Sequence, residues 1–211
     1  MNISKFKKLP ILGILRGIGP EAVEPITECA ISSGLETIEI TMNTTLAPDL
    51  IRKMSAHAGH DLTIGAGTVL GIESLKSALD AGARFIVMPV LIEDVMEYCV
   101  KNNIPAFPGA LTPQEIYKAW KAGASMVKVF PSGFFGPEYF KEIKGPFNDI
   151  ELLACGGVTS DNLNEYFSCG ANAIAFGASV FKKEWLANRD FKSIGNSIKR
   201  YIETFKERGR T

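Results

Sequence analysis

The 211-residue sequence predicts one (β/α)8 barrel that spans residues 1–211 as a single domain. Short runs rich in Ile, Val and Thr recur eight times, and segments with helical spacing of apolar residues separate them. This alternation predicts a parallel sheet, and eight such units in about 200 residues match the lower size limit of a closed barrel. An open doubly wound sheet is the alternative, but the first strand-to-helix turn, at residues 16–20, lacks its Gly-x-Gly-x-x-Gly pattern.

The strands are expected, in chain order, at residues 11–17, 37–42, 63–69, 85–90, 105–109, 126–131, 151–158 and 173–179. Between them we expect helices, among others at residues 22–33, 72–81, 95–101 and 113–122. A short helix within residues 1–9 precedes the barrel, and an amphipathic helix at 188–207 ends it. Capping residues or a first-turn proline begin several helices, as at 112–115 and 159–162, and glycine ends others.

Charge and composition limit the classes of partner. Lys+Arg and Asp+Glu both total 23, so the formal net charge is zero and no global field attracts nucleic acid or a membrane surface. The apolar runs are too short to span a membrane, and the N-terminal residues do not read as a signal peptide, so we expect a cytoplasmic protein. The four cysteines form no Cys-x-x-Cys pair and are expected as reduced thiols. His57 and His60 lack further ligands, so neither a metal nor a cofactor is expected.

Lys128 is the most informative residue in a strand. It lies between Val127 and Val129 in the sixth expected strand. Side chains alternate along a strand, so two valines that pack outward against helices would direct Lys128 into the barrel. Burial disfavours the ammonium form and so favours the neutral amine that attacks a carbonyl. A lysine that reaches the barrel mouth or pairs with a buried acid is the alternative.

Glu39 is the second charged residue inside a strand. In the second expected strand, Ile38 and Ile40 would face outward, which directs Glu39 and Thr41 inward. A buried carboxylate is costly unless it is paired or protonated. Glu39 is therefore predicted to be a structural partner of a buried cation, a general acid and base, or both.

Further polar residues lie where strands end. Arg16 ends the first strand, where its cation suits a substrate carboxylate or phosphate, although a simple surface position is the alternative. The third strand ends in Gly-Ala-Gly-Thr-Val at 65–69, where the glycines let a ligand approach the backbone and Thr68 offers a hydroxyl.

Glycine and serine end the last two strands. Gly156 and Gly157 follow the seventh strand, and Gly177 and Ser179 lie at the end of the eighth. In barrels, the loops at these two places often bind phosphate through backbone N–H groups. We therefore expect a phosphorylated substrate, with glycines that serve only tight turns as the alternative.

These stretches together resemble the family of 2-keto-3-deoxy-6-phosphogluconate and 4-hydroxy-2-oxoglutarate aldolases. The resemblance extends from Ile-Leu-Arg-Gly at 14–17 to Phe-Gly-Ala-Ser at 176–179. Its sharpest pieces are Ile-Glu-Ile-Thr at 38–41, Gly-Ala-Gly-Thr-Val at 65–69, Pro-Gly at 108–109, Lys-Val-Phe-Pro at 128–131 and Gly-Gly-Val at 156–158. Each piece is common alone, but their order and spacing are specific.

The resemblance implies a homotrimeric class I lyase that releases pyruvate from a phosphorylated keto acid. Lys128 matches the Schiff-base lysine of the family, and Glu39 matches its proton-transfer glutamate. The other matches are substrate contacts: Thr68 for the pyruvate carboxylate, Pro89 and Phe130 for the pocket walls, and Gly156, Gly157 and Ser179 for the phosphate.

One position departs from the gluconate-type members, which carry an arginine four residues after the glutamate to help hold the substrate carboxylate. Here that position is Asn43, which with Ile-Leu-Arg-Gly at 14–17 looks more like the branch that cleaves 2-keto-3-deoxy-6-phosphogalactonate. Arg16 could then supply the missing cation from the first strand, while Thr41 and Asn43 offer polar contacts from the second.

The leading hypothesis is retro-aldol cleavage to pyruvate and glyceraldehyde 3-phosphate, with 4-hydroxy-2-oxoglutarate as a further substrate. A second hypothesis keeps the phosphate site but assigns isomerase or epimerase chemistry, with Glu39 as the base. A third treats the chain as a non-catalytic barrel that binds phosphorylated metabolites. Two histidines offer little for a metal-dependent class II aldolase.

Overall fold

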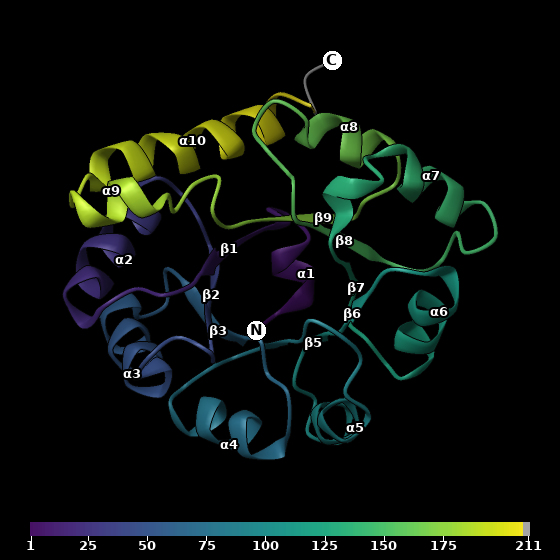
Figure 1. Ribbon diagram of the computed structural model, residues 1–211, viewed down its shortest axis with the longest axis horizontal. Helices are drawn as coiled ribbons and strands as arrows, with labels where there is room; N and C mark the ends of the chain where they lie inside the picture. The colour runs from purple at the N-terminus through teal and green to yellow at the C-terminus, as the bar shows by residue number, and fades with distance from the viewer. Residues whose placement is uncertain (209–211) are drawn as a thin grey trace.

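A computed structural model describes residues 1–208, which form a ring of parallel strands surrounded by helices (Figure 1). The strands are β1 (Ile11–Leu15), β2 (Thr37–Thr41), β3 (Thr63–Gly67), β4 (Ile86–Val87), β5 (Ala106–Phe107), β6 (Gly109–Ala110), β7 (Val127–Val129), β8 (Leu152–Cys155) and β9 (Ala173–Phe176). Their order in the sheet is β5-β4-β3-β2-β1-β9-β8-β7-β6. From β1 to β5 and from β6 to β9, each strand pairs with its neighbour in sequence, and β1 pairs with β9.

The fifth expected strand, at 105–109, is divided into β5 and β6 by Pro108. Proline has no N–H to donate, which interrupts a strand. The carbonyl of Phe107 accepts the N–H of Met88 on one side (3.1 Å), and the carbonyl of Pro108 accepts the N–H of Lys128 on the other (2.9 Å). This segment therefore bonds to both neighbours and completes the ring. The predicted (β/α)8 barrel is confirmed, with its fifth strand in two pieces.

Helices cover the outside of the ring (Figure 1). The α-helices are α1 (Ile3–Phe6), α2 (Val23–Ser32), α3 (Ala47–Ala58), α4 (Ile72–Asp80), α5 (Glu93–Lys101), α6 (Pro113–Lys121), α7 (Glu138–Lys144), α8 (Leu163–Ser168), α9 (Lys183–Ala187) and α10 (Phe191–Glu207), and the 3-10 helices are η1 (Pro20–Ala22) and η2 (Ser132–Phe134). The four helices that the sequence analysis places between strands agree with α2, α4, α5 and α6 to within two residues at each end.

Capping side chains fix several helix starts. Thr112 and Glu115 form the expected capping box: the Thr112 hydroxyl accepts the N–H of Glu115 (3.3 Å), and the Glu115 carboxylate accepts the N–H of Thr112 (2.9 Å). At the other end of the chain, the side chain of Asp190 accepts the N–H of Ser193 (3.0 Å). This cap starts α10 at Phe191, so the helix expected from residue 188 begins three residues later, after the separate helix α9.

Strand alternation divides the buried side chains into two cores. Outward side chains such as Ile38, Ile40 and Val127 pack between the strands and the helices. Inward side chains form a smaller cluster within the ring: Phe6, Leu12, Phe85, Val87, Phe107, Met126, Leu153, Cys155, Ala173 and Ala175. The ring is therefore filled with side chains rather than open, and polar groups can reach solvent only at its ends.

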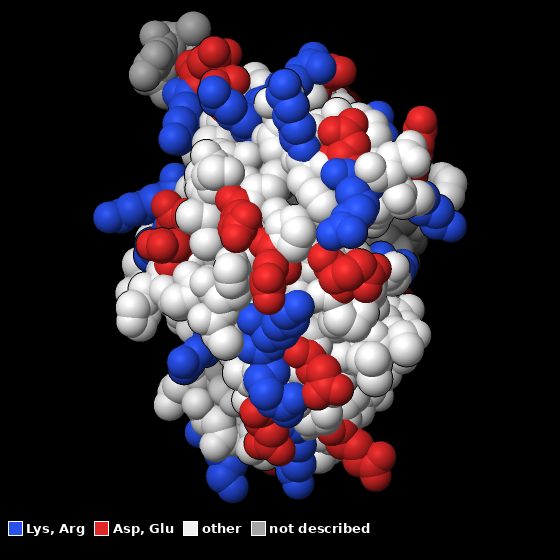
Figure 2. All heavy atoms as spheres, turned by 90° about the vertical axis from the view of Figure 1, so that its left-hand side faces the viewer, with Lys and Arg blue, Asp and Glu red and all other residues white. Residues whose placement is uncertain are grey.

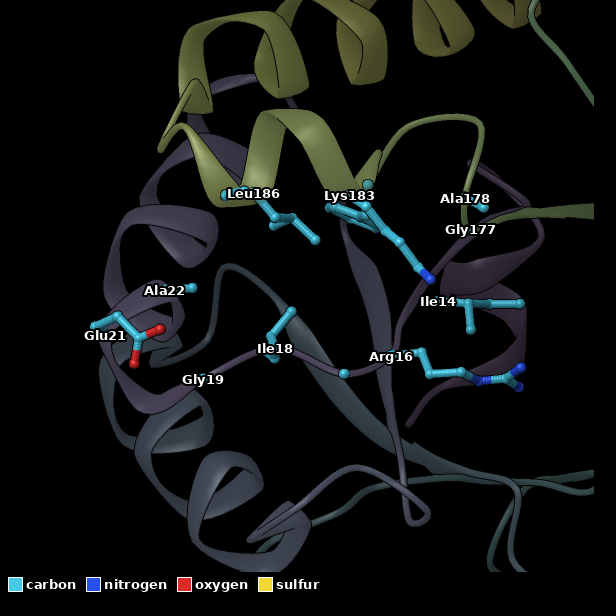
Figure 3. A pocket seen from close by; sticks show the side chains of 13 residues that line it. Ile14, Arg16, Ile18, Gly19, Glu21, Ala22, Gly177, Ala178, Lys183 and Leu186 are labelled. Atoms are coloured by element: carbon cyan, nitrogen blue, oxygen red, sulfur yellow. The ribbon is translucent and has the colours of Figure 1, made fainter.

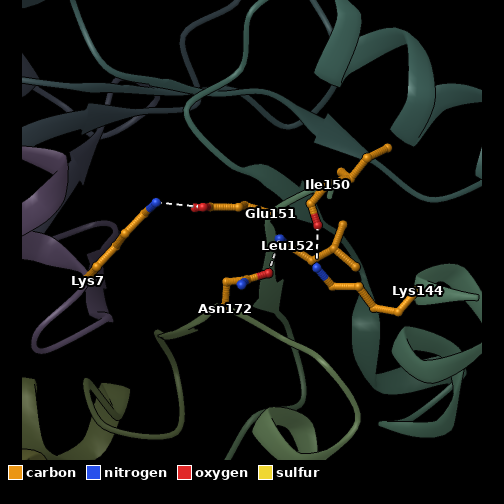
Figure 4. A network of polar contacts seen from close by, with 6 residues as sticks. All are labelled: Lys7, Lys144, Ile150, Glu151, Leu152 and Asn172. Atoms are coloured by element: carbon orange, nitrogen blue, oxygen red, sulfur yellow. Dashed lines mark hydrogen bonds and ion pairs between the residues drawn. The ribbon is translucent and has the colours of Figure 1, made fainter. Parts of the chain in front are cut away.

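Helix α1 closes one end of the ring, where it lies at the centre of the view in Figure 1. Its Phe6 is buried and packs edge-on against Phe107, with ring centroids 5.9 Å apart. Lys7, which follows α1, pairs with Glu151 immediately before β8 (Figure 4). These contacts place α1 at the N-terminal ends of the strands, which leaves the C-terminal ends for a ligand.

The surface carries mixed charge. On the face formed by α2 and α3, acidic and basic side chains intermingle (Figure 2). Lys53 on α3 pairs with Glu24 on α2 (3.2 Å), for example, and His57 lies 3.5 Å from Glu28. Within residues 1–208, no helix is long and apolar enough to span a membrane, and no three His, Cys, Asp or Glu side chains gather to hold a metal ion.

Truncation of Phe6 tests how much the packing of α1 against the barrel interior contributes to stability. Phe6→Ala is expected to lower the free energy of unfolding by about 3 to 5 kcal/mol, because it removes a buried ring and leaves a cavity in the barrel. Urea denaturation measures this change. Lys8→Ala, at an exposed position just beyond α1, is the control and should change stability little. Equal free energies of unfolding for the two variants would show that the buried Phe6 ring does not contribute to stability.

Candidate active site

A cavity of about 420 Å³ opens at the C-terminal ends of the strands. It is lined by residues from the ends of β1, β3, β4, β7, β8 and β9 or directly after them. Nine of the residues predicted from the sequence lie in its wall: Arg16, Thr68, Pro89, Lys128, Phe130, Gly156, Gly157, Gly177 and Ser179. The structure thus brings together side chains that span more than 160 residues of sequence, from 16 to 179.

Lys128 points into the barrel, as its two flanking valines predict. Val127 and Val129 are fully buried in the outer core, whereas Lys128 is 7% exposed and reaches the cavity. Its ammonium lies 5.2 Å from the centroid of the Phe130 ring, which forms one wall. A single amine with apolar surroundings is therefore open to a small molecule in the cavity.

Glu39 is buried deeper, with 1% of its surface exposed, and does not line the cavity. Its carboxylate occupies space beside Gly67, where a Cβ atom would lie 2.2 Å from Oε1. Among the described residues, Oε2 has no hydrogen-bond partner. Burial raises the pKa of Glu39 from 4.5 to about 7, although the charges of Lys128 and Arg16 act in the opposite direction. The carboxyl can therefore exchange a proton near neutral pH.

Arg16 follows β1 and is exposed at the cavity mouth. No ion pair neutralises it within the described part of the chain. It also lines an adjoining cavity of about 610 Å³ between η1 and α9, in which the Lys183 side chain is directed toward Ile14 (Figure 3). Two cations, Arg16 and Lys183, thus lie on the β1 and β9 side of the site, where they suit an anionic substrate, and Glu21 lines the far side of the adjoining cavity.

Thr68 has an unusual backbone conformation, with φ of 54°. This left-handed region is rare for a β-branched residue and stores strain. The turn that follows β3 holds Thr68 in the cavity wall, opposite the β8 and β9 loops in the order of the sheet. Strain of this kind gathers at functional sites, which supports the interpretation of Thr68 as a ligand contact.

The loop after β8 depends on its glycines. Gly156 and Gly157 have φ of 88° and 82°, and a Cβ at Gly157 would lie 2.6 Å from the Cα of Gly133. Buried Ser132 fixes the start of this loop, since its hydroxyl lies 3.0 Å from the Cys155 carbonyl and 2.8 Å from the Gly156 carbonyl. A loop of this shape brings its backbone close to a ligand, which suits an anion such as phosphate.

The expected helix start at 159–162 braces the same loop. The side-chain Nδ2 of Asn162 donates to the Gly157 carbonyl (3.0 Å), and its side-chain Oδ1 accepts the N–H of Thr159 (2.8 Å). Helix α8 begins immediately after it. Asn162 is the N-cap residue of α8, but its side chain bonds to the preceding loop and not to the helix.

Two predicted contacts lie outside the cavity wall. Thr41 is fully buried, and its hydroxyl lies 3.0 Å from that of Thr44, which in turn accepts the N–H of Gly17 (3.0 Å). It thus helps to join the loops after β1 and β2. Asn43 is exposed in the turn after β2 and does not line the cavity. Their roles as substrate contacts stay predictions.

Cys155 is a cavity residue that sequence reasoning did not assign. Its buried thiol lies close enough to Lys128, Glu39 and Arg16 for their charges to act on it, and burial raises its pKa. The signal was present, because alternation along β8 places Cys155 on the same face as Leu153. Lys183 was also missed, and nothing in its local sequence distinguishes it from a surface lysine.

Comparison with known proteins identifies the family of the chain that carries this site. The sequence profile described as KDPG and KHG aldolase matches residues 3–197. The chain belongs to this aldolase family. The predicted resemblance is confirmed, and so is the prediction that the chain is a lyase of the aldolase type.

Relatives named for two sugar acids match this aldolase over nearly its whole length. It is 32% identical to the 2-dehydro-3-deoxy-6-phosphogalactonate aldolase of Escherichia coli, over 93% of this chain and 96% of the relative. It is 30% identical to a 2-dehydro-3-deoxy-phosphogluconate aldolase of Haemophilus influenzae, over 97% of this chain and 96% of the relative.

Solved structures share the fold of this aldolase. A native KDPGal structure superposes with a TM-score of 0.90 at 30% identity and covers 97% of this chain and 98% of its own. A KDPG aldolase of Legionella pneumophila, captured with pyruvate as a covalent carbinolamine, superposes with a TM-score of 0.88 at 23% identity. It covers 96% of this chain and 98% of its own.

The raised pKa of Glu39 predicts a pH-dependent stability. Because its pKa is higher in the folded chain than in the unfolded chain, the stabilisation is present below pH 4.5 and is lost as the pH rises past 7. Glu39→Gln, which mimics the protonated form, should exceed the parent in stability by up to about 3 kcal/mol near pH 8 and by little near pH 4.

Urea denaturation across this pH range measures the difference between the two proteins. Glu142→Gln, at an exposed position on α7, is the matched control and should show the parent's profile. Parallel pH profiles for the parent and Glu39→Gln would show that the pKa of Glu39 is not raised.

Proposed function

We propose that this aldolase uses Lys128 to form a Schiff base with a 2-keto-3-deoxy-6-phospho sugar acid and releases pyruvate and glyceraldehyde 3-phosphate. The observation that carries the proposal is one lysine, buried in β7, whose amine opens into a cavity, with buried Glu39 close enough for the charge of Lys128 to lower its pKa. Schiff-base chemistry needs an amine that reaches the carbonyl and a nearby group that moves protons, the two roles that we assign to Lys128 and Glu39.

The mechanism follows from these two groups. The Lys128 amine attacks the C2 carbonyl of the substrate, and loss of water gives an iminium. Glu39, as a carboxylate, takes the proton of the C4 hydroxyl, directly or through a water molecule. The C3–C4 bond then breaks, its electron pair moves toward the iminium to give an enamine, and the aldehyde leaves. Protonation of the enamine and addition of water release pyruvate and return the free amine.

The cavity offers a place for each end of the substrate. Arg16 and Thr68 suit the carboxylate, since Arg16 is a cation without an ion pair among residues 1–208 and Thr68 offers a hydroxyl in the wall. The glycine loops after β8 and β9, with Ser179, suit the phosphate. Phe130 and Pro89 would exclude water from the reacting carbons.

The galactonate-type sugar acid is the preferred epimer in this proposal. The preference rests on Asn43, which stands where gluconate-type members carry arginine. 4-Hydroxy-2-oxoglutarate fits the same chemistry without a phosphate and serves as a poorer substrate. The ratio of kcat/KM for the two phosphorylated epimers tests the preference.

We also propose that the aldolase acts as a homotrimer in the cytoplasm. Phe134 and Phe135, in and after η2, are 86% and 57% exposed, and apolar side chains this exposed commonly mark an interface between proteins. The four cysteines are free, as thiols of a reducing compartment are. The mass of the particle in solution tests the trimer.

Trapping with borohydride tests the Schiff base. Incubation with pyruvate and sodium borohydride should add the mass of reduced pyruvate to the parent, because only an iminium is reduced to a stable adduct. Lys128→Ala should gain nothing, whereas Lys121→Ala, at an exposed lysine of α6, should gain the same mass as the parent. Mass spectrometry of the intact chain measures the adduct.

A folded parent that binds pyruvate without an adduct would overturn the class I mechanism. An isomerase with Glu39 as the base, or a barrel that only binds phosphorylated metabolites, would then take its place. The family match favours the aldolase over both.

A further inference from the structure

Tyr201 of helix α10 lies behind the two loops assigned to the phosphate. It is 2% exposed, and its ring packs against Phe176 of β9 with ring centroids 4.8 Å apart. It does not line the substrate cavity. It lines instead a polar cavity of about 570 Å³ on the outer side of the same loops, which shares Thr159 and Ser179 with the substrate cavity. Tyr201 is therefore part of the wall between two cavities.

The hydroxyl of Tyr201 joins the loops after β8 and β9. It donates to the Val158 carbonyl (2.9 Å) and lies 3.0 Å from the hydroxyl oxygen of Ser179. A carbonyl can only accept, and a phenol has one proton, so in this arrangement Ser179 donates to Tyr201. The alternative bond of Ser179 to Val158 is long, at 3.5 Å. The position of the Ser179 hydroxyl thus depends on Tyr201.

We propose that Tyr201 is a positioning residue for the phosphate-binding half of the site and acts through Ser179 and Val158. The inference rests on the proposed function, because it requires a phosphate between these two loops. Both partners line the substrate cavity, so a hydroxyl that fixes them orients groups that would face the phosphate. Groups fixed before binding lose less freedom when the ligand arrives, which strengthens the complex.

Removal of the hydroxyl alone separates this role from packing. Tyr201→Phe keeps the ring against Phe176 but leaves Ser179 free to rotate and the Val158 carbonyl without its best partner. We expect KM for the phosphorylated sugar acid to rise roughly tenfold, the change that corresponds to one lost hydrogen bond, with kcat within about twofold of the parent.

Two reactions that involve no phosphate serve as internal readouts. The rate of borohydride trapping with pyruvate and kcat/KM for 4-hydroxy-2-oxoglutarate should be unchanged in Tyr201→Phe. Tyr139→Phe is the matched control, since it also removes a hydroxyl that donates to a backbone carbonyl, here that of Leu111. It should leave KM for the phosphorylated substrate unchanged.

A double-mutant cycle that combines Tyr201→Phe with Ser179→Ala tests whether the effect of Tyr201 on KM is transmitted through Ser179. If Tyr201 acts largely through Ser179, the double variant should raise KM by much less than the product of the two single changes. An unchanged KM in Tyr201→Phe would overturn the inference. So would an equal loss for the phosphorylated and unphosphorylated substrates, because that result indicates general damage to the fold.

Measurements on the parent protein show whether the proposed function has failed, as distinct from the role of Tyr201. A parent without a pyruvate adduct has no Schiff-base chemistry, and a parent that does not prefer the phosphorylated substrate has no phosphate site. Only a parent with both properties and a Tyr201→Phe variant that retains both contradicts the role of Tyr201 by itself.

Discussion

Two ionisable side chains held inside a closed ring of strands are the constraint on which this structure depends. The interior of the barrel is filled with apolar side chains, yet Lys128 and Glu39 both point inward from β7 and β2. Each is the central residue of its strand, and Lys128 reaches the cavity at the C-terminal ends whereas Glu39 stays buried. The raised pKa of Glu39 is the direct result, and the chemistry proposed for the site uses that result.

The two ends of the barrel divide stability from function. At the N-terminal ends, α1 places Phe6 against Phe107 and seals the apolar interior. At the C-terminal ends, glycines without side chains and the strained Thr68 leave room for a ligand. The half-exposed pair of Lys7 and Glu151 contributes less than the buried rings, because ion pairs open to water are weak. The free energy gained from apolar burial at the N-terminal end thus offsets the cost of backbone strain at the C-terminal end.

Strand alternation made most of the fold and the site predictable. The valines beside Lys128 and the isoleucines beside Glu39 indicate which way each side chain points, and glycine runs mark the loops that we propose bind the phosphate. What the sequence did not reveal depends on contacts between distant residues. The division of the fifth strand arises from pairing on both sides of Pro108, and the positive φ of Thr68 arises from the turn after β3. Tyr201 reaches Val158 across 43 residues, which no local pattern records.

The pairing of β1 with β9 has a consequence for synthesis of the chain on the ribosome. Ile11 lies opposite Ile174, so the first strand keeps one edge without a partner until nearly the whole chain has emerged. During that interval the nascent chain exposes unpaired backbone groups, which is the period when chaperones protect a folding barrel from aggregation. Tyr201 emerges later still, so its hydrogen bond to the loop after β8 is among the last contacts of the molecule to form.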